Sequence, residues 1–335
     1  MIFPIEIHLN PLLSTLFYYI YRLAKTKRMK KALVISGGGS KGAFAGGVAQ
    51  YLMRNQGREY DIFVGTSTGS LLIPQLALNN LEKLHHAYTN VNQRSIFDVN
   101  PFVVKKKGDR EYVTINYITT LFQFIRRKRT FGESNNLRKT IAKNFSRASF
   151  EMLLKGNKEV VVSVSNLSKN RVEYKSIHDY DYETFIDWIW MSCNYIPFMS
   201  LVTKDGFEYG DGGLGSVVPI REAIRRGAKE VDVIILESEN MDHNKVLGKN
   251  PFSLMISIFG FVLDQIEYHD ISEGILAAKH NGVQLNLYYT PTKLTENSLV
   301  FNKKRMTEWW QQGFAYAHEK FNSNSSPLPQ KKELY

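Results

Sequence analysis

Residues 60–73 read Tyr-Asp-Ile-Phe-Val-Gly-Thr-Ser-Thr-Gly-Ser-Leu-Leu-Ile, which is an apolar run, a turn of small residues and a second apolar run. Tyr60–Val64 has the length of a buried strand, and Ser70–Ile73 begins a helix-like stretch. Between them Gly65–Gly69 matches G-x-S-x-G, the pattern of a nucleophile elbow, in which a sharp strand-to-helix turn exposes a serine hydroxyl above a sheet. Glycine suits both ends of this turn because it has no Cβ to block a tight bend. Ser67 is therefore a candidate nucleophile, although a plain Gly/Ser/Thr turn fits the same residues.

A second strand, glycine loop and helix precede the first. The apolar run Ala32–Ser36 leads into the loop GGGSKG at residues 37–42. Consecutive glycines expose backbone N–H groups at a helix N-terminus, where the helix dipole favours negative charge, so Gly37, Gly38 and Gly39 are candidate oxyanion donors. The loop also satisfies G-x-G-x-x-G, but dinucleotide binding requires an acid at the end of the next strand, about 20 residues on. Asp61 begins its strand instead, which argues against a nucleotide cofactor.

A general base must accompany a nucleophilic serine, and Asp211 is the best candidate. The run Phe207–Gly210 has the character of a strand and leads directly into Asp211-Gly212-Gly213. A carboxylate at a strand end, followed by glycines, leaves room for other groups to approach closely. An ordinary Asp-Gly turn is the alternative interpretation of the same residues.

The remaining pattern predicts an α/β fold. Apolar runs of strand length recur at Glu159–Val164 and Val231–Leu236, and Pro219–Arg226 has helical spacing closed by Gly227. Strands that alternate with helices imply a mostly parallel central sheet covered by helices on both faces, which is a three-layer sandwich. We predict one main domain over residues 29–321, an N-terminal segment over 1–28 and a flexible tail over 322–335.

Charge and cysteine content narrow the classes of partner. Lys and Arg total 43 against 32 Asp and Glu, which gives a formal charge of +11 with basic runs at 22–31, 105–107 and 126–129. Such runs suit an anionic membrane surface or are simply solvated. No zinc-finger or RNA-recognition signature is present, so we expect no nucleic-acid partner. Cys193 is the sole cysteine, which excludes an intramolecular disulfide framework and favours a reducing compartment. We therefore expect the protein in the cytoplasm. The basic runs suggest peripheral binding to the inner face of the membrane.

Two apolar stretches precede basic runs. Pro11–Ala24 is shorter than the roughly 20 residues that a membrane span needs, and its charges follow the apolar part, unlike those of a secretory signal. This stretch is either an interfacial helix or lies before a true start at Met29. The second stretch, Asn116–Ile125, predicts either a surface helix near the site or a core helix.

The motifs GGGSKG, GTSTG and DGG, in this order, resemble those of the patatin-like phospholipases. The similarity covers about Lys30 to Leu236 well, including the small-residue and proline segment Ser192–Phe198, and extends loosely to about Lys320. The resemblance implies a patatin-like sandwich and a lipid acyl hydrolase of the phospholipase A or lysophospholipase type, which needs no metal and no cofactor. Its substrate would be a phospholipid or another acyl lipid at a membrane surface.

The resemblance also assigns roles to residues. Ser67 would attack the ester carbonyl, Asp211 would accept its proton directly as the second member of a catalytic dyad, and the 37–39 segment would hold the oxyanion of the step to an acyl-enzyme. Lys41, at the family's basic position, would help to hold the loop in place. The residues expected to support the motifs are Lys41, Gly42, Gly65, Gly69, Gly212 and Gly213.

Two other functions stay open at this point. A Ser-Asp-His triad in the order of the α/β-hydrolases requires a histidine after Asp211. A lipid-binding pseudoenzyme would keep the fold without turnover. The histidines available for a triad are His243, His269, His280 and His318.

Overall fold

The structure is a computed structural model that describes residues 29–107, 110–239, 251–295 and 297–324. The predictions for the N-terminal segment 1–28 and for the tail from 325 onwards lie outside the described residues. The last described helix, α12 (Lys303–Asn324), continues past residue 322, where the tail was expected to begin.

A mixed sheet forms the centre of the molecule, with the strand order β10-β9-β1-β2-β5-β8-β7 and with β6 also paired to β5. The strands β10, β9, β1, β2 and β5 run parallel to one another, and β6, β8 and β7 are antiparallel to their neighbours. The bounds are β1 Lys31–Ile35, β2 Ile62–Thr66, β5 Glu159–Asn166, β6 Arg171–Ser176, β7 Val202–Lys204, β8 Phe207–Asp211, β9 Glu230–Ser238 and β10 Gln284–Thr290.

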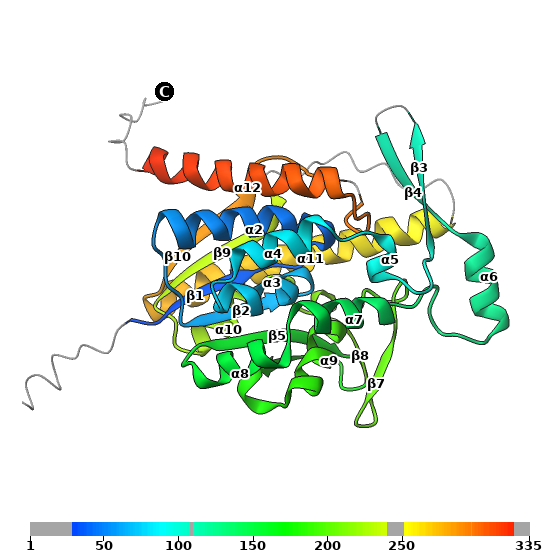
Figure 1. The fold of residues 1–335 in the computed structure, drawn as a ribbon, viewed down its shortest axis with the longest axis horizontal. Helices are drawn as coiled ribbons and strands as arrows, with labels where there is room; N and C mark the ends of the chain where they lie inside the picture. The colour runs from blue at the N-terminus through cyan, green and yellow to red at the C-terminus, as the bar shows by residue number, and fades with distance from the viewer. Residues whose placement is uncertain (1–28, 108–109, 240–250, 296, 325–335) are drawn as a thin grey trace, which may run out of the picture.

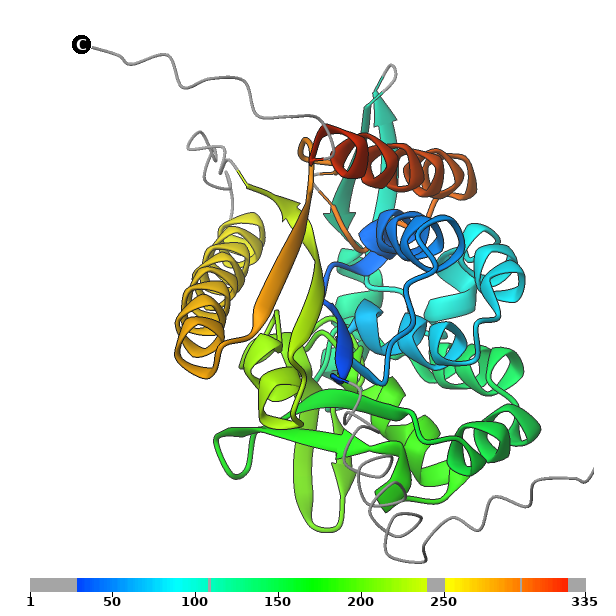
Figure 2. The same cartoon turned by 90° about the vertical axis from the view of Figure 1, so that its left-hand side faces the viewer.

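Helices cover both faces of this sheet, which confirms the predicted three-layer α/β sandwich (Figures 1 and 2). The helices α10 and α11 lie on one face, while α2, α3, α4 and α12 lie on the other. Alternate residues of β1 show why: Leu33 and Ile35 belong to one apolar cluster, and Ala32 and Val34 belong to the other. A strand buried on both faces reads as a continuous apolar run, as the sequence does.

The other described elements are a separate hairpin and the helices. A two-stranded antiparallel hairpin of β3 (Phe102–Lys107) and β4 (Arg110–Ile115) stands apart from the main sheet. The helical elements are η1 Gly39–Lys41, α2 Gly42–Gln50, η2 Tyr51–Asn55, α3 Thr68–Ala77, α4 Leu81–Thr89, α5 Gln93–Ile96, α6 Tyr117–Ile125, α7 Asn135–Asn144, α8 Arg147–Lys155, η3 Ile177–Asp179, α9 Tyr182–Ser192, η4 Gly212–Leu214, α10 Ile220–Arg225 and α11 Pro251–Asn281.

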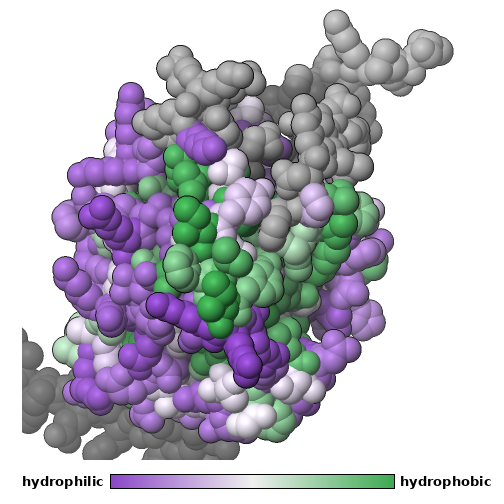
Figure 3. All heavy atoms as spheres, turned by 90° about the vertical axis from the view of Figure 1, so that its right-hand side faces the viewer, coloured by the Kyte–Doolittle hydropathy of each residue, from purple (hydrophilic) through white to green (hydrophobic). Residues whose placement is uncertain are grey.

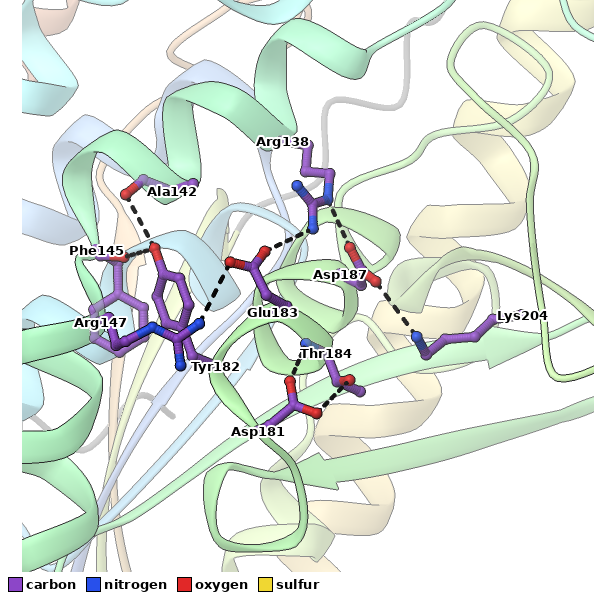
Figure 4. Close-up of polar contacts among 10 residues, drawn as sticks. All are labelled: Arg138, Ala142, Phe145, Arg147, Asp181, Tyr182, Glu183, Thr184, Asp187 and Lys204. Atoms are coloured by element: carbon purple, nitrogen blue, oxygen red, sulfur yellow. Dashed lines mark hydrogen bonds and ion pairs between the residues drawn. The ribbon is translucent and has the colours of Figure 1, made fainter.

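Helix α9 matters to the site because its C-terminal end lies against the turn after β2. Its N-terminal end is capped by Asp181, whose carboxylate accepts the Thr184 N–H at 2.9 Å (Figure 4). On the same helix Asp187 and Glu183 both accept from Arg138 of α7, at 2.6 and 3.2 Å. Partly exposed ion pairs of this kind stabilise little, so their effect is to orient α9 against α7.

Helix α6 is a surface helix, so the alternative that it belongs to the core is wrong. Its apolar side chains Ile118, Leu121 and Phe122 are exposed, and only the polar Thr120 and Gln123 are buried. Asn116 caps its first turn by accepting the Thr119 N–H.

The turn between β2 and α3 is packed so closely that its glycines have no room for a side chain. A Cβ on Gly65 would lie 2.5 Å from the carbonyl carbon of Gly69. A Cβ on Gly69 would lie 2.2 Å from the carbonyl oxygen of Ile35 on the neighbouring strand. The close approach of α3 to β1 therefore depends on Gly69.

We predict that Gly69→Ala lowers the free energy of unfolding by about 2–3 kcal/mol, because backbone atoms of β1 must move to admit the methyl group. Denaturant unfolding of both proteins measures the difference. The matched control is Gly260→Ala in α11, where a Cβ meets open space. There the change should stay within about 1 kcal/mol and favour stability, since alanine has the higher helix propensity. Equal effects of the two substitutions would contradict this account of the turn.

Candidate active site

Ser67 occupies the tight turn between β2 and α3 in a strained conformation. Its φ of 51° and ψ of −118° lie in a region that non-glycine residues rarely adopt. Such a conformation costs on the order of 1–3 kcal/mol and persists only where neighbouring groups hold it. The side chain is partly exposed while its neighbours in the turn are buried. The nucleophile-elbow pattern is thus realised in the backbone.

The end of α9 holds the Ser67 backbone on both sides. The Ser67 N–H donates to Ser192 Oγ at 3.0 Å, and the Cys193 thiol donates to the Ser67 carbonyl oxygen at 3.1 Å. Ser192 Oγ also lies 2.7 Å from Ser70 Oγ in the first turn of α3. These contacts offset part of the backbone strain at Ser67. The family resemblance included the 192–198 segment, but nothing in the sequence indicated this role for Ser192.

Asp211 lies at the end of β8, beside the serine. Ser67 Oγ donates to Asp211 Oδ2 at 2.7 Å, and the Gly213 N–H donates to Asp211 Oδ1 at 2.7 Å. Burial raises the pKa of Asp211 to about 7, although the two hydrogen bonds favour its charged form. A carboxylate with a pKa near neutrality can accept a proton from the serine and return it during a reaction.

The glycine loop lies next to the serine but does not offer all three predicted N–H groups. A Cβ on Gly37 would lie 3.5 Å from Ser67 Cβ, so the two are neighbours. The Gly37 N–H donates to the Val217 carbonyl oxygen at 3.1 Å, and the prediction that it is a free oxyanion donor is wrong for this arrangement. Within the described part of the chain, the N–H groups of Gly38 and Gly39 have no such backbone acceptor.

The residues predicted to support the motifs pack around this loop. Lys41 is buried and forms an ion pair with Glu237, near the end of β9, which matches a role in holding the loop. A Cβ on Gly42 would lie 2.4 Å from Thr68 Oγ1 in the elbow helix. A Cβ on Gly212 would lie 2.3 Å from Ser163 Oγ on β5. The three sequence motifs therefore meet at one edge of the sheet.

Asp270 of α11 is a positioning residue that the sequence did not reveal. Its carboxylate accepts the Val218 N–H at 2.9 Å and lies within 3.4 Å of Ser216 Oγ. The loop that it holds supports both halves of the site: Val217 accepts from Gly37, and the Ser216 carbonyl oxygen accepts from Thr66 Oγ1 at 3.0 Å. Burial raises the pKa of Asp270 to about 6. No signal in the sequence singled it out, because Asp264, Glu267 and Glu273 lie in the same stretch.

The histidines available for a triad lie elsewhere. His269 and His280 are on α11 and His318 is on α12, where its ring packs edge-on against Tyr51. No histidine in the described ranges forms a hydrogen bond with Ser67 or Asp211, and His243 lies outside them. The described residues also hold no group of three or more acidic, histidine or cysteine side chains arranged for a metal ion.

An apolar cavity of about 310 Å³ lies beside η4, the short turn that follows Asp211. Leu214, in the turn that follows Asp211 and Gly213, forms one wall. Leu263, another lining residue, is close to Gly213, because a Cβ on Gly213 would lie 3.9 Å from Leu263 Cδ2. The other walls come from the first half of α11, a stretch in which the sequence showed no motif. The cavity is lined by Leu214, Pro251, Leu254, Met255, Ile258, Phe259, Val262 and Leu263.

Comparison with known proteins places this site in a family. The family model described as "Patatin-like phospholipase" matches residues 33–224, more than half of the chain. "Uncharacterized protein YjjU" of Escherichia coli (strain K12) is 28% identical over 209 residues, which are 61% of this chain and 51% of that protein, so the chain spans about half of its relative. The crystal structure of VipD from Legionella pneumophila superposes with a TM-score of 0.50 at 11% identity, over 88% of this chain and 67% of that one. At this identity the likeness concerns the fold alone.

We predict that Asp211→Asn stabilises the protein above neutral pH. The folded-state pKa of about 7 exceeds the ordinary value of 3.8, so the folded state keeps a proton that the unfolded state has lost, and wild-type stability falls as pH rises from about 4 to about 7. The variant avoids this cost and should gain about 2–4 kcal/mol at pH 8, with little gain at pH 4.

Denaturant unfolding across this pH range measures the effect. Asp181→Asn is the control, since the hydrogen bond from the Thr184 N–H lowers the pKa of this exposed helix cap. It should show no gain on raising the pH. A gain for Asp211→Asn that does not depend on pH would contradict the assignment of a buried, neutral-range carboxylate.

Proposed function

The chain belongs to the patatin-like phospholipase family, and we propose that it is a serine lipid acyl hydrolase that cleaves carboxylic ester bonds of membrane lipids through a Ser67–Asp211 dyad. The observation that carries the proposal is the 2.7 Å hydrogen bond from Ser67 Oγ to Asp211 Oδ2. It joins a strained nucleophile directly to a buried base, with no histidine between the two residues. Family membership supports a lipid hydrolase in general; the dyad and the ester bond are our inference.

Acylation would begin with the proton already directed at the base. As Ser67 Oγ attacks the ester carbonyl carbon, its proton passes to Asp211 Oδ2, and the carbonyl oxygen gains negative charge. The N–H groups of Gly38 and Gly39 would stabilise this oxyanion, beside the start of α2. When the tetrahedral intermediate collapses, the bond to the leaving alcohol breaks, and that oxygen takes the proton from Asp211. The product is an acyl ester on Ser67.

In deacylation, water would be the nucleophile and Ser67 would be the leaving group. A water molecule gives a proton to Asp211 and attacks the acyl carbonyl carbon, and the second intermediate releases the fatty acid as the proton returns to Ser67 Oγ. Asp211 must be ionised at the start of both half-reactions. Since its pKa is about 7, the rate should rise through neutral pH.

The surroundings of the dyad support an acyl lipid as the substrate. The apolar cavity beside Asp211 has the character of an acyl-chain site, and it would desolvate the ester while the chain is bound. Every described helix is either too short or too polar for a bilayer span. We propose peripheral binding to a membrane, with no nucleic-acid partner and no cofactor.

The triad and the pseudoenzyme are tested by the same substitutions. We expect Ser67→Ala and Asp211→Asn each to lower the turnover of phospholipid by at least about 10³-fold, because each removes a group that takes part in both half-reactions. Replacement of any of the four candidate histidines by alanine should leave most of the activity. Mass spectrometry of fatty acids released from a mixed lipid extract measures turnover. The control substitutions are His243→Ala, His269→Ala, His280→Ala and His318→Ala.

Two outcomes would overturn the proposal. A single essential histidine would replace the dyad by a triad. Failure of a fluorophosphonate probe to label Ser67 in the folded wild-type protein, together with intact lipid binding, would favour a lipid-binding pseudoenzyme.

Ser192→Ala tests how the nucleophile is held. The substitution removes the oxygen that accepts the Ser67 N–H, and we expect kcat to fall about 10- to 100-fold with little change in KM, because Ser67 is misplaced but the lipid site is intact. The free energy of unfolding should fall by about 1–2 kcal/mol. Ser192→Thr, which keeps the hydroxyl, should recover part of the activity. Equal losses for both variants would indicate a purely steric role for this position.

A further inference from the structure

An exposed apolar surface covers one side of the molecule, where α6 and the first half of α11 lie. In α6 the exposed fraction reaches 71% at Ile118 and 68% at Ile125, and in α11 it is 60% at Phe261. Figure 3 looks onto this side and shows apolar side chains gathered in a band bordered by strongly hydrophilic ones. We call this surface the α6–α11 face; its exposed apolar residues are Tyr117, Ile118, Leu121, Phe122, Phe124, Ile125, Leu254, Ile256, Ile258, Phe261 and Val262.

Packed aromatic rings connect the two helices beneath this face. Phe124 of α6 lies 6.2 Å from Phe131, measured between ring centroids, and Phe131 lies 5.8 Å from the buried Phe198. Phe198 in turn lies 6.5 Å from Phe259 of α11. The continuous contact indicates that α6 and α11 present one supported surface. Large exposed apolar patches on a folded protein mark interaction sites.

The charges around the α6–α11 face suit an anionic partner. Residues 116–129, which include α6, contain no Asp or Glu and end in Arg126-Arg127-Lys128-Arg129. Lys128 pairs with Glu133 and Arg129 with Glu208, whereas Arg126 and Arg127 are exposed and have no ion pair among the described side chains. In α11 the whole stretch Pro251–Leu263 is uncharged. An apolar surface with a cationic border matches the acyl and headgroup layers of an anionic bilayer.

The lengths of the apolar stretches in the two helices favour insertion into the interface. The 13 residues of Pro251–Leu263 span about 20 Å, well short of the roughly 30 Å hydrocarbon core of a bilayer. Helix α6 is shorter still. Both stretches can therefore lie along a membrane surface with their apolar side chains among the acyl chains, and neither is long enough to cross the hydrocarbon core.

The cavity beside Asp211 opens on this same face. Leu254, Ile258 and Val262 line the cavity, and all three are also exposed on the α6–α11 face. Leu214 also lines the cavity, and it belongs to the turn that follows Asp211. An acyl chain held in this cavity would contact apolar side chains of α11 and lie next to the turn that follows Asp211.

We propose that the α6–α11 face docks on anionic lipid bilayers and that a lipid acyl chain enters the active site from the bilayer along the first half of α11. Docking itself stands on exposure, charge and helix length. Only the entry of the acyl chain rests on the proposed function. The occupant of the face is the bilayer, and a second copy of this chain is the competing outcome.

Vesicle co-sedimentation tests docking without turnover if the full chain carries Ser67→Ala. We expect this protein to bind vesicles of phosphatidylcholine with phosphatidylglycerol more tightly than vesicles of phosphatidylcholine alone. Adding Phe122→Glu should weaken binding by about tenfold or more, and Arg126→Gln with Arg127→Gln should weaken binding to the anionic vesicles alone. Met152→Glu is the matched control, since Met152 is 65% exposed but lies on α8, away from the face, and binding should not change.

A second measurement does not depend on a charged substitution. Cys193 is the sole cysteine and is buried, so Phe122→Cys and Met152→Cys can be labelled selectively with an environment-sensitive fluorophore. Anionic vesicles should shift the emission of the label at position 122 to the blue and leave the label at 152 unchanged. No shift at either position would overturn the docking proposal.

Turnover assays separate docking from chemistry. In the otherwise wild-type protein, Phe122→Glu should lower hydrolysis of vesicle phospholipid about tenfold and leave hydrolysis of a soluble short-chain ester unchanged. If the wild-type protein binds vesicles but hydrolyses neither substrate, the proposed function fails and docking stands. If light scattering shows that Phe122→Glu dissociates a dimer while vesicle binding is unchanged, the face joins two copies of this chain and the docking proposal is overturned.

Discussion

The hydrogen bond between Ser67 Oγ and the buried carboxylate of Asp211 is the constraint on which the rest of the site depends. Ser67 directly follows β2 and Asp211 ends β8, and β5 lies between these two strands in the sheet. Their side chains therefore meet only if β5 pairs with both neighbours in register. The serine must also stay in a strained turn, and α9 supplies the groups that hold it there. Burial raises the pKa of the Asp211 carboxyl to about 7, which costs stability at neutral pH.

Helix α11 links the chemistry to the surface of the molecule. Its inner side carries Asp270, which holds the loop that supports both Thr66 and Gly37. Its first half lines the apolar cavity and contributes to the α6–α11 face. A molecule that contacts this helix at the outer face therefore touches an element that is hydrogen-bonded to the loop that accepts the Gly37 N–H. No other described helix lines this cavity as well as the outer face.

Part of the fold could be predicted from the sequence because burial of a strand on both faces leaves a local pattern of apolar residues. The strands β1, β2, β5 and β9 are buried on both faces or nearly so, and such strands are continuous apolar runs. The strands β6 and β7 are short, antiparallel and largely polar, so neither gave a comparable signal. The strand β10 has the apolar–polar alternation of a half-buried strand and was not predicted. Helix α11 was not recognised for a different reason. Apolar residues surround it in its first half, and in its second half exposed apolar residues such as Leu276 accompany the buried Ala278, so the sequence shows no single apolar face.

By itself, the sequence determined which residues can carry the chemistry, because a nucleophile elbow, a glycine loop and an Asp-Gly turn each require particular residue types at short spacing. It also determined the α/β class through its buried strands. Only the tertiary structure decided which of these groups already have hydrogen-bond partners and which residues hold them in place. The Gly37 N–H is occupied by Val217, Ser192 supports the elbow, and Asp270 holds the loop from a distant helix. Each of these contacts joins residues far apart in the chain, so it depends on how the sheet and helices pack and leaves no local pattern to read.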